Sequence, residues 1–187
     1  MIAFSCACGE IHGTLRDIDA RSGTGLVCFC TYCRAAEVFL DQPDPESDGV
    51  GQYQTTPDHV SFAKGGNRMY AFSFAQDGLI RWYAKCCKVP LFITPPDPKK
   101  AQVNVLVDRL AETGPLGPIR AMLFQPDGAG RRTHAGLRQL RIAQWRRAWR
   151  MRRTGAWKTS PFFGKSGAPI SRVHVLSPIE TTHLPLD

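Results

Sequence analysis

Seven cysteines are the residues of this 187-residue chain best suited to chemistry, and they are clustered along it. They are Cys6, Cys8, Cys28, Cys30, Cys33, Cys86 and Cys87. Thiolate sulfur binds Zn²⁺ at about 2.3 Å, and sulfurs two or three residues apart on a tight turn can point at one ion. Where thiols stay reduced, an odd number of cysteines in such clusters indicates metal binding or catalysis more than disulfides. The spacing therefore predicts at least one zinc site.

The seven thiols divide naturally into a group of four and a group of three. A closed four-thiolate zinc site is structural, whereas a three-thiolate site leaves one position open for water or a substrate. We predict two zinc ions, held as follows: one by Cys6, Cys8, Cys86 and Cys87, and the other by Cys28, Cys30 and Cys33. Two alternatives stay open at this point. The chain can hold a single zinc with the remaining thiols buried, or both sites can be purely structural.

The composition favours an ordinary globular protein. Hydrophobic residues make up 43% of the chain and charged residues 21%, which allows a real core and argues against a wholly disordered chain. No apolar run approaches the roughly 18 residues needed to cross a bilayer. The first residues contain no basic stretch followed by an apolar one, so we expect no secretory signal and a cytoplasmic protein.

Short strand-like runs dominate the first two thirds of the sequence, and they predict a mainly β fold. They lie at 11–15, 25–28, 52–55, 59–62, 69–74, 79–83, 89–94 and 103–107. Residues 64–67 contain two glycines and predict a hairpin turn between the runs on either side. A turn or two of helix is expected at 34–40. We assign a zinc-binding domain to residues 1–112 and a Gly/Pro-rich connection to 113–136, which includes a short apolar piece at 119–124. A basic helix and an irregular tail, with one late strand candidate at 173–176, fill 137–187.

The order of the motifs resembles a known family. The motifs are Cys6-Ala7-Cys8-Gly9, then Cys28-Phe29-Cys30-Thr31-Tyr32-Cys33, then Arg81-Trp82-Tyr83 followed by cysteines. Their order is similar to that of the glutathione-dependent formaldehyde-activating enzymes. Centromere protein V-like proteins belong to the same superfamily. The resemblance covers about residues 4 to 95 and implies an Mss4-like zinc-binding β fold.

Carried over to this chain, the resemblance implies a structural zinc on Cys6 and Cys8. It implies a second zinc on Cys28, Cys30 and Cys33, where a thiol substrate such as glutathione binds. The family completes the structural site with two later cysteines. The second of these matches Cys87, but the first falls on Ala84. Either Cys86 supplies the missing thiolate after a local backbone change, or the site has three cysteines and an unknown fourth ligand.

The implied activity is of the carbon–sulfur lyase type, on an S-hydroxymethyl or similar thiol adduct. Two further departures from the family bear on it, since Phe29 replaces the usual histidine and Lys88 the usual glycine. Arg34 and Arg81 are candidates for binding the carboxylates of glutathione, with a solvated surface role as the alternative. His12 is a minor candidate for a fourth ligand of the first site.

The segment 131–153 is strongly basic, and it is the second distinctive feature of the sequence. It contains nine arginines and no acid in a chain whose net charge is +8, so the rest of the protein is close to neutral. Residues 137–153 contain good helix formers and end before Gly155, which predicts a helix. Trp145 and Trp149 lie four residues apart and share a face of it. We expect this helix to pack on the domain through its Trp face, or to contact an anionic membrane or nucleic acid. The latter would make the protein a non-enzymatic, zinc-stabilised binding module.

Overall fold

Two β-sheets form the framework in the computed structural model, which describes residues 1–19 and 21–186. Within these residues the smaller sheet has the antiparallel order β1 (Ile2–Ser5), β2 (His12–Leu15) and β5 (Val60–Lys64). The larger sheet of the described residues runs in the order β11 (Arg132–Ala135), β10 (Ile119–Pro126), β3 (Thr24–Cys28), β4 (Val50–Thr55), β9 (Val103–Leu106), β8 (Pro90–Thr94), β7 (Ile80–Ala84), β6 (Met69–Ser73) and β12 (Val173–Val175). The helices are α1 (Thr31–Phe39), α2 (Leu137–Thr154) and α3 (Pro178–Thr181).

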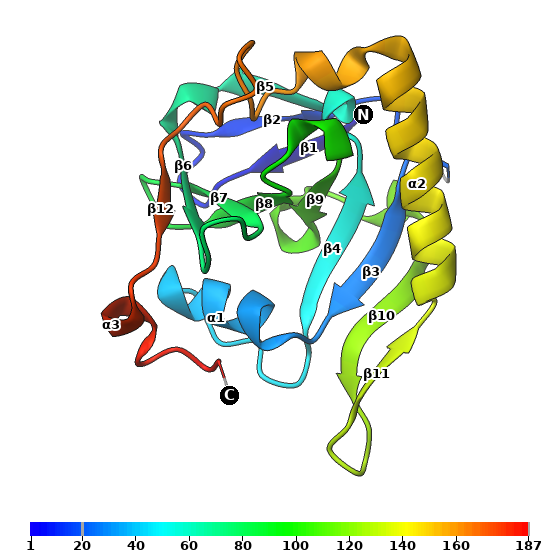
Figure 1. The fold of residues 1–187 in the computed structure, drawn as a ribbon. Coiled ribbons are helices and arrows are strands. Elements are labelled where there is room, and N and C mark those ends of the chain that lie inside the picture. The colour runs from blue at the N-terminus through cyan, green and yellow to red at the C-terminus, as the bar shows by residue number, and fades with distance from the viewer. Residues whose placement is uncertain (20, 187) are drawn as a thin grey trace.

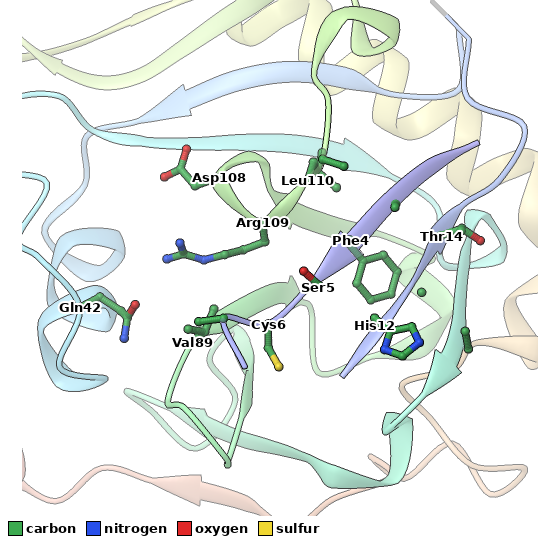
Figure 2. A pocket seen from close by; sticks show the side chains of 15 residues that line it. Phe4, Ser5, Cys6, His12, Thr14, Gln42, Val89, Asp108, Arg109 and Leu110 are labelled. Carbon is green, nitrogen blue, oxygen red and sulfur yellow. The ribbon is translucent and has the colours of Figure 1, made fainter. Parts of the chain in front are cut away.

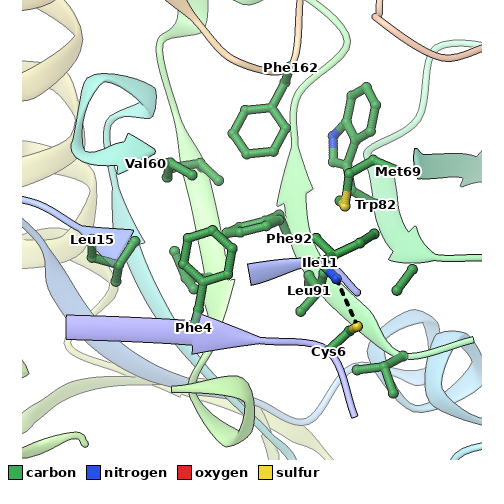
Figure 3. Packing of buried hydrophobic residues seen from close by; sticks show 14 of the residues in the cluster. Phe4, Cys6, Ile11, Leu15, Val60, Met69, Trp82, Leu91, Phe92 and Phe162 are labelled. Atoms are coloured by element: carbon green, nitrogen blue, oxygen red, sulfur yellow. Dashed lines mark hydrogen bonds between the residues drawn. The ribbon is translucent and has the colours of Figure 1, made fainter. Parts of the chain in front are cut away.

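The main hydrophobic core brings side chains of both sheets together (Figure 3). Phe4 of β1 contacts Phe92 of β8 edge to face, with ring centroids 5.1 Å apart. Phe162, from the chain after α2, enters the same core and lies 5.4 Å from Trp82 of β7. The indole of Trp82 donates a hydrogen bond to Thr94 at 2.9 Å, which satisfies its buried polar atom. The C-terminal third of the chain is therefore part of this core.

Helix α1 covers a second, smaller cluster. Phe39 packs on Phe72 of β6 at 4.7 Å between ring centroids, and Leu40 and Leu176 are buried beside them. The strand β6 is thus buried on both faces, because Met69 and Ala71 point into the main core while Phe72 faces α1. Every residue of β6 is buried except Tyr70, which is half-exposed.

Helix α2 lies alongside β10 and also contacts β4 (Figure 1). Its buried side chains are Leu140, Arg147 and Met151. The guanidinium of Arg147 donates hydrogen bonds to Thr24 at 3.1 Å and Gln54 at 3.0 Å. The prediction that the Trp face packs on the domain is wrong, since Trp145 and Trp149 are 67% and 50% exposed.

The mainly β fold with a C-terminal helix is confirmed, and most strands lie within a few residues of the predicted runs. The turn at 64–67 does not close a hairpin, because β5 and β6 belong to different sheets. Residues 113–136, expected as a connection, contain β10 and β11. The strand β10 pairs in parallel with β3, and sequence patterns do not reveal a pairing between segments so far apart. Within the described residues, no helix has the length and apolar character needed to span a membrane.

Candidate metal centres and the adjoining pocket

The first cysteine cluster brings together two turns that lie far apart in the sequence. Cys6 and Cys8 lie in the turn between β1 and β2, and Cys86 and Cys87 in the turn between β7 and β8. The Sγ atom of Cys8 lies 3.0 Å from that of Cys86, and Cys6 Sγ lies 3.5 Å from Cys8 Sγ and 3.8 Å from Cys86 Sγ. Cys86 and Cys87 are 3.9 Å apart. All four sulfurs converge on one point.

These separations fit a metal better than a disulfide. A disulfide needs sulfurs at about 2.05 Å, and all seven cysteines are free. A tetrahedron of thiolates around zinc has sulfur–sulfur edges of roughly 3.8 Å, given zinc–sulfur bonds of about 2.3 Å. The backbone N–H of Ile11 donates to Cys6 Sγ at 3.3 Å, the dashed contact in Figure 3. Such a donor stabilises a thiolate and fixes its direction.

The structure shows how the β7–β8 turn presents its two thiols. Ala84 is fully buried in β7 opposite Met69, so this position offers no ligand to the cluster. Cys86 instead reaches Cys6 and Cys8 from the exposed turn. Lys88, which follows the two cysteines, adopts φ = 56°, a left-handed conformation that favours glycine. The turn thus brings two adjacent cysteines, Cys86 and Cys87, to the cluster.

The second cluster is formed where a strand runs into a helix. Cys28 ends β3, Cys30 is the N-cap of α1, and Cys33 lies in its first turn. Cys28 Sγ donates to Cys30 Sγ at 3.3 Å, and the backbone N–H of Cys33 donates to Cys30 Sγ at 3.4 Å. All three sulfurs lie within 4.8 Å of one another. In the described part of the chain, no His, Asp, Glu or further Cys joins this group.

The electrostatics of the second cluster favour a thiolate at Cys30. Hydrogen bonds from Cys28 and then Cys33 lower the pKa of Cys30 to about 3. The same contact with Cys30 raises the pKa of Cys28 to about 11, and contacts with Cys28 and Cys30 raise the pKa of the buried Cys33 thiol. A metal ion would replace these shared protons, since thiols must lose their protons to coordinate.

A chain of side-chain amides leads from Cys33 to helix α2. Gln52 Nε2 donates to Cys33 Sγ at 3.3 Å, and Asn104 Nδ2 donates to Gln52 Oε1 at 2.6 Å. Gln102 Nε2 donates to Asn104 Oδ1 at 3.0 Å, and Gln144 of α2 donates in turn to Gln102. In this row of hydrogen bonds each amide nitrogen donates to the next residue toward Cys33, so all the amides point the same way. The row also holds the Cys33 sulfur in place.

The second cluster opens into a pocket of about 710 Å³, within the size range of small-ligand sites. We refer to it as the α2 pocket, because α2 forms one of its walls. It is lined by all three cysteines, the amides of Gln52, Gln54, Gln102, Asn104 and Gln144, and apolar side chains such as Leu26, Ile93, Leu123 and Leu140. The charged residues among its described lining are Arg81, Arg132 and Arg141.

The two arginines singled out from the sequence have different environments. Arg34 forms a two-pronged ion pair with Asp44 at 2.6 and 2.7 Å on the surface and does not line the α2 pocket. Arg81 is only 5% exposed and lines it. One of its nitrogens donates to Leu79 O at 3.2 Å, its guanidinium lies 4.6 Å from the Phe74 ring, and its Nε has no hydrogen-bond partner. Burial lowers the pKa of Arg81, and the nearby cysteines oppose that shift.

Another hollow, of about 640 Å³, lies beside the first cluster (Figure 2). Of the four clustered cysteines only Cys6 lines it, together with His12 and Arg109. His12 does not join the sulfurs, and its Nδ1 lies 2.9 Å from the carbonyl oxygen of Gly9. The hollow is therefore separate from the three-cysteine site.

Sequence reasoning missed the residues that complete the α2 pocket. The four residues are polar and lie in otherwise ordinary strands, turns and helix: Gln52, Gln102, Asn104 and Gln144. Only their place in one hydrogen-bonded row, with Gln52 and Asn104 buried, distinguishes them. Arg132 was counted only as part of the basic segment. Its guanidinium lies 3.4 Å from the carbonyl oxygen of Phe29, between Cys28 and Cys30.

Comparisons with known proteins place the chain in a family but assign no activity. No curated protein matches the chain. Among solved structures, the crystal structure of a Rhodobacter sphaeroides protein is similar, with 15% identity and a TM-score of 0.44. That match covers 63% of this chain and 96% of the other. Residues 1–111 match a family model, and the chain accordingly belongs to the family of unknown function DUF6151.

Proposed function

We propose that this protein is a zinc-dependent enzyme of the carbon–sulfur lyase type, with an Mss4-like fold, that acts on glutathione or a similar small thiol. One zinc would be held by the four-cysteine cluster and serve stability. The other would be held by Cys28, Cys30 and Cys33. When bound there, zinc would favour the deprotonated form of an incoming thiol. The proposal also assigns the protein to the cytoplasm, where the cysteine thiols stay reduced.

The observation that carries the proposal is the opening of the three-sulfur cluster into the α2 pocket. A structural thiolate site is closed by four protein ligands. Here three sulfurs converge at the wall of a cavity of about 710 Å³. The four-cysteine cluster differs, because its own cysteines can supply all four ligands of a closed site.

The reaction we propose is the reversible addition of a thiol to a small aldehyde. In the forward direction the S–H bond breaks, a C–S bond forms, and the proton passes to the carbonyl oxygen. The residues of this chain bind and orient the thiol for that step. Arg81 offsets the negative charge of the thiolates, and the apolar wall at Leu26, Ile93 and Leu140 excludes water.

Cobalt substitution tests the proposal directly. Protein loaded with Co²⁺ should change its thiolate-to-cobalt absorption when glutathione is added at millimolar concentration. Cys33→Ser should abolish this change, and Cys87→Ser, at the other cluster, should not. An unchanged spectrum in the wild-type protein would rule out direct thiol binding at the metal.

A second candidate function rests on the exposed face of α2. Trp145 and Trp149 project into solvent, and Arg153 lies over the Trp149 ring at 4.6 Å. Lys100, Arg141 and Arg152 line a shallow hollow with both tryptophans. Aromatic side chains among arginines suit an anionic surface, either a membrane or a nucleic acid.

Co-sedimentation with vesicles separates this candidate from the first. Binding to vesicles rich in phosphatidylserine, lost in a Trp145→Ala/Trp149→Ala variant that retains its metal, would support a membrane-binding module. Retention of DNA instead, with no vesicle binding, would favour nucleic acid. Binding to neither would remove this candidate.

A further inference from the structure

The α2 pocket has one wall from outside the region that matches the family. The three cysteines, Gln52 and Arg81 lie within residues 1–111. Arg132, Leu140, Arg141 and Gln144 lie beyond it and face the same cavity. The family-matching region thus supplies the sulfurs, and the C-terminal segment supplies the opposite wall.

That wall is attached to the metal cluster by direct contacts. The backbone N–H of Phe29 donates to the Leu123 carbonyl of β10 at 2.8 Å, and Arg132 lies within 3.4 Å of the Phe29 carbonyl oxygen. Cys28 pairs with Leu123 across the β3–β10 ladder. Because these contacts flank Cys28 and Cys30, a ligand bound at the sulfurs would lie against this wall.

The charged side chains among the described lining of the pocket are all positive. Arg81, Arg132 and Arg141 line it, and in the described part of the chain none of them is paired with a carboxylate. Arg81 is buried with its Nε unpartnered. Arg132 uses one terminal nitrogen on the carbonyl oxygens of Phe29 and Phe124, and Arg81 uses one on that of Leu79. A buried N–H without an acceptor is costly, and the remaining donors of these arginines suit a carboxylate.

We infer that the α2 pocket selects thiols that carry a carboxylate, with Arg132 and Arg141 of the C-terminal segment, together with Arg81, as the residues that recognise it. The sulfur of the ligand lies at Cys28, Cys30 and Cys33, and its anionic end lies among the arginines. The segment after residue 111 thereby sets the substrate specificity of a cluster that the family-matching region provides. This inference rests on the proposed function, since it assumes that a thiol binds at the three cysteines.

The main competing explanation gives the arginines a purely local role. Arg81 would then only balance the negative charge of the thiolates, and Arg132 would only hold the Phe29 carbonyl. In that case any thiol of suitable size would bind equally well, with or without a carboxylate. The two explanations differ in the dependence of affinity on the charge of the ligand.

The test compares glutathione with its diethyl ester, which has the same thiol but no free carboxylate. Each is titrated into the Co²⁺-loaded full-length protein while the thiolate-to-cobalt absorption is recorded. The wild type should bind glutathione about tenfold more tightly than the ester, a ratio of affinities that corresponds to one charge-assisted hydrogen-bonded pair. Arg132→Ala should reduce this ratio severalfold at unchanged metal content, and Arg132→Lys should restore part of it.

Arg138→Ala is the matched control. It removes one charge from the same basic segment, at an exposed residue outside the pocket lining, and should leave the ratio unchanged. Equal binding of the acid and the ester by the wild type would overturn the inference while leaving the proposed function intact. A preference for the acid that survives in Arg132→Ala would overturn the assignment to this wall. No spectral change with either ligand would instead refute the proposed function itself.

Discussion

The side-chain amide of Gln52 donates a hydrogen bond to the sulfur of Cys33 at 3.3 Å. Gln52 belongs to β4 and Cys33 to α1, so the bond connects the large sheet to the helix that carries the cluster. Both residues are buried. An amide donor to a thiolate ligand fixes its orientation and supports its negative charge, as outer partners commonly do at metal sites.

Replacing Gln52 by Met should destabilise the protein. The substitution retains most of the volume but removes the bond to Cys33 and leaves the Asn104 amide without its acceptor. We expect the free energy of unfolding to fall by about 1–3 kcal/mol, measured by urea denaturation of the metal-loaded protein. Gln144→Ala, at the outer end of the same amide chain, should have a smaller effect. An unchanged stability in Gln52→Met would show that the amide chain contributes nothing.

The role of Cys86 can be separated from that of residue 84, two positions earlier in the chain. Cys86→Ser should lower the metal content by one ion per chain, because Cys86 Sγ lies within 3.8 Å of both Cys6 Sγ and Cys8 Sγ. Adding Ala84→Cys should not restore the ion, since residue 84 is fully buried in β7. Metal analysis of the purified variants measures both. Full metal content in Cys86→Ser would show that another residue completes the site.

Glu37 should lower the free energy of unfolding as the pH rises. Burial raises the pKa of Glu37 to about 7, although Arg109 lies 3.4 Å away and opposes the shift. The unfolded chain releases this proton near pH 4.3, so the folded state binds more protons between about pH 4.3 and 7. The contribution of Glu37 to stability is therefore present below this window and lost as the pH rises through it.

Glu37→Gln should remove that dependence. Its free energy of unfolding, relative to the wild type, should rise as the pH increases from 5 to 8 in denaturant titrations. Glu112→Gln, at an exposed carboxyl, serves as the control and should show no such trend. A constant difference between Glu37→Gln and the wild type over this range would mean that Glu37 is ionised throughout.

Two neighbouring arginines of α2 should respond differently to truncation. Arg147 is 8% exposed and donates to Thr24 and Gln54, and burial lowers its pKa to about 10. Arg147→Ala removes this packing and leaves two buried acceptors unpaired, so we expect a loss of about 2–4 kcal/mol. Arg146→Ala changes the same charge at an exposed residue and should alter stability by less than about 0.5 kcal/mol. Thermal unfolding of the two variants measures the difference, and equal effects would contradict the docked position of α2.

Local sequence patterns were sufficient for most of the strands, though not for β1, β10 or β11, and for helix α2 and the two groups of cysteines. Strand-like runs such as 52–55 and 103–107 appear as β4 and β9, because each is short and contains residues that favour strands, such as Tyr53, Thr55 and the valines of 103–107. Close spacing alone brings Cys28, Cys30 and Cys33 together, since a strand end followed by a helix N-terminus places all three on one turn. Of the two alternatives for α2, packing through its tryptophans is wrong, because Arg147 is buried while Trp145 and Trp149 are exposed, the reverse of the usual preference.

The sequence by itself determined the mainly β character of the fold, the basic C-terminal helix and the thiol donors that suit a metal. Only the tertiary structure decided that Cys86, and not residue 84, faces Cys6 and Cys8, and that β10 pairs in parallel with β3. It also decided that α2 closes a pocket over the second cluster. The physical reason is range: spacing and periodicity act over a few residues, whereas these contacts depend on the free energy of packing segments about 80 to 100 residues apart.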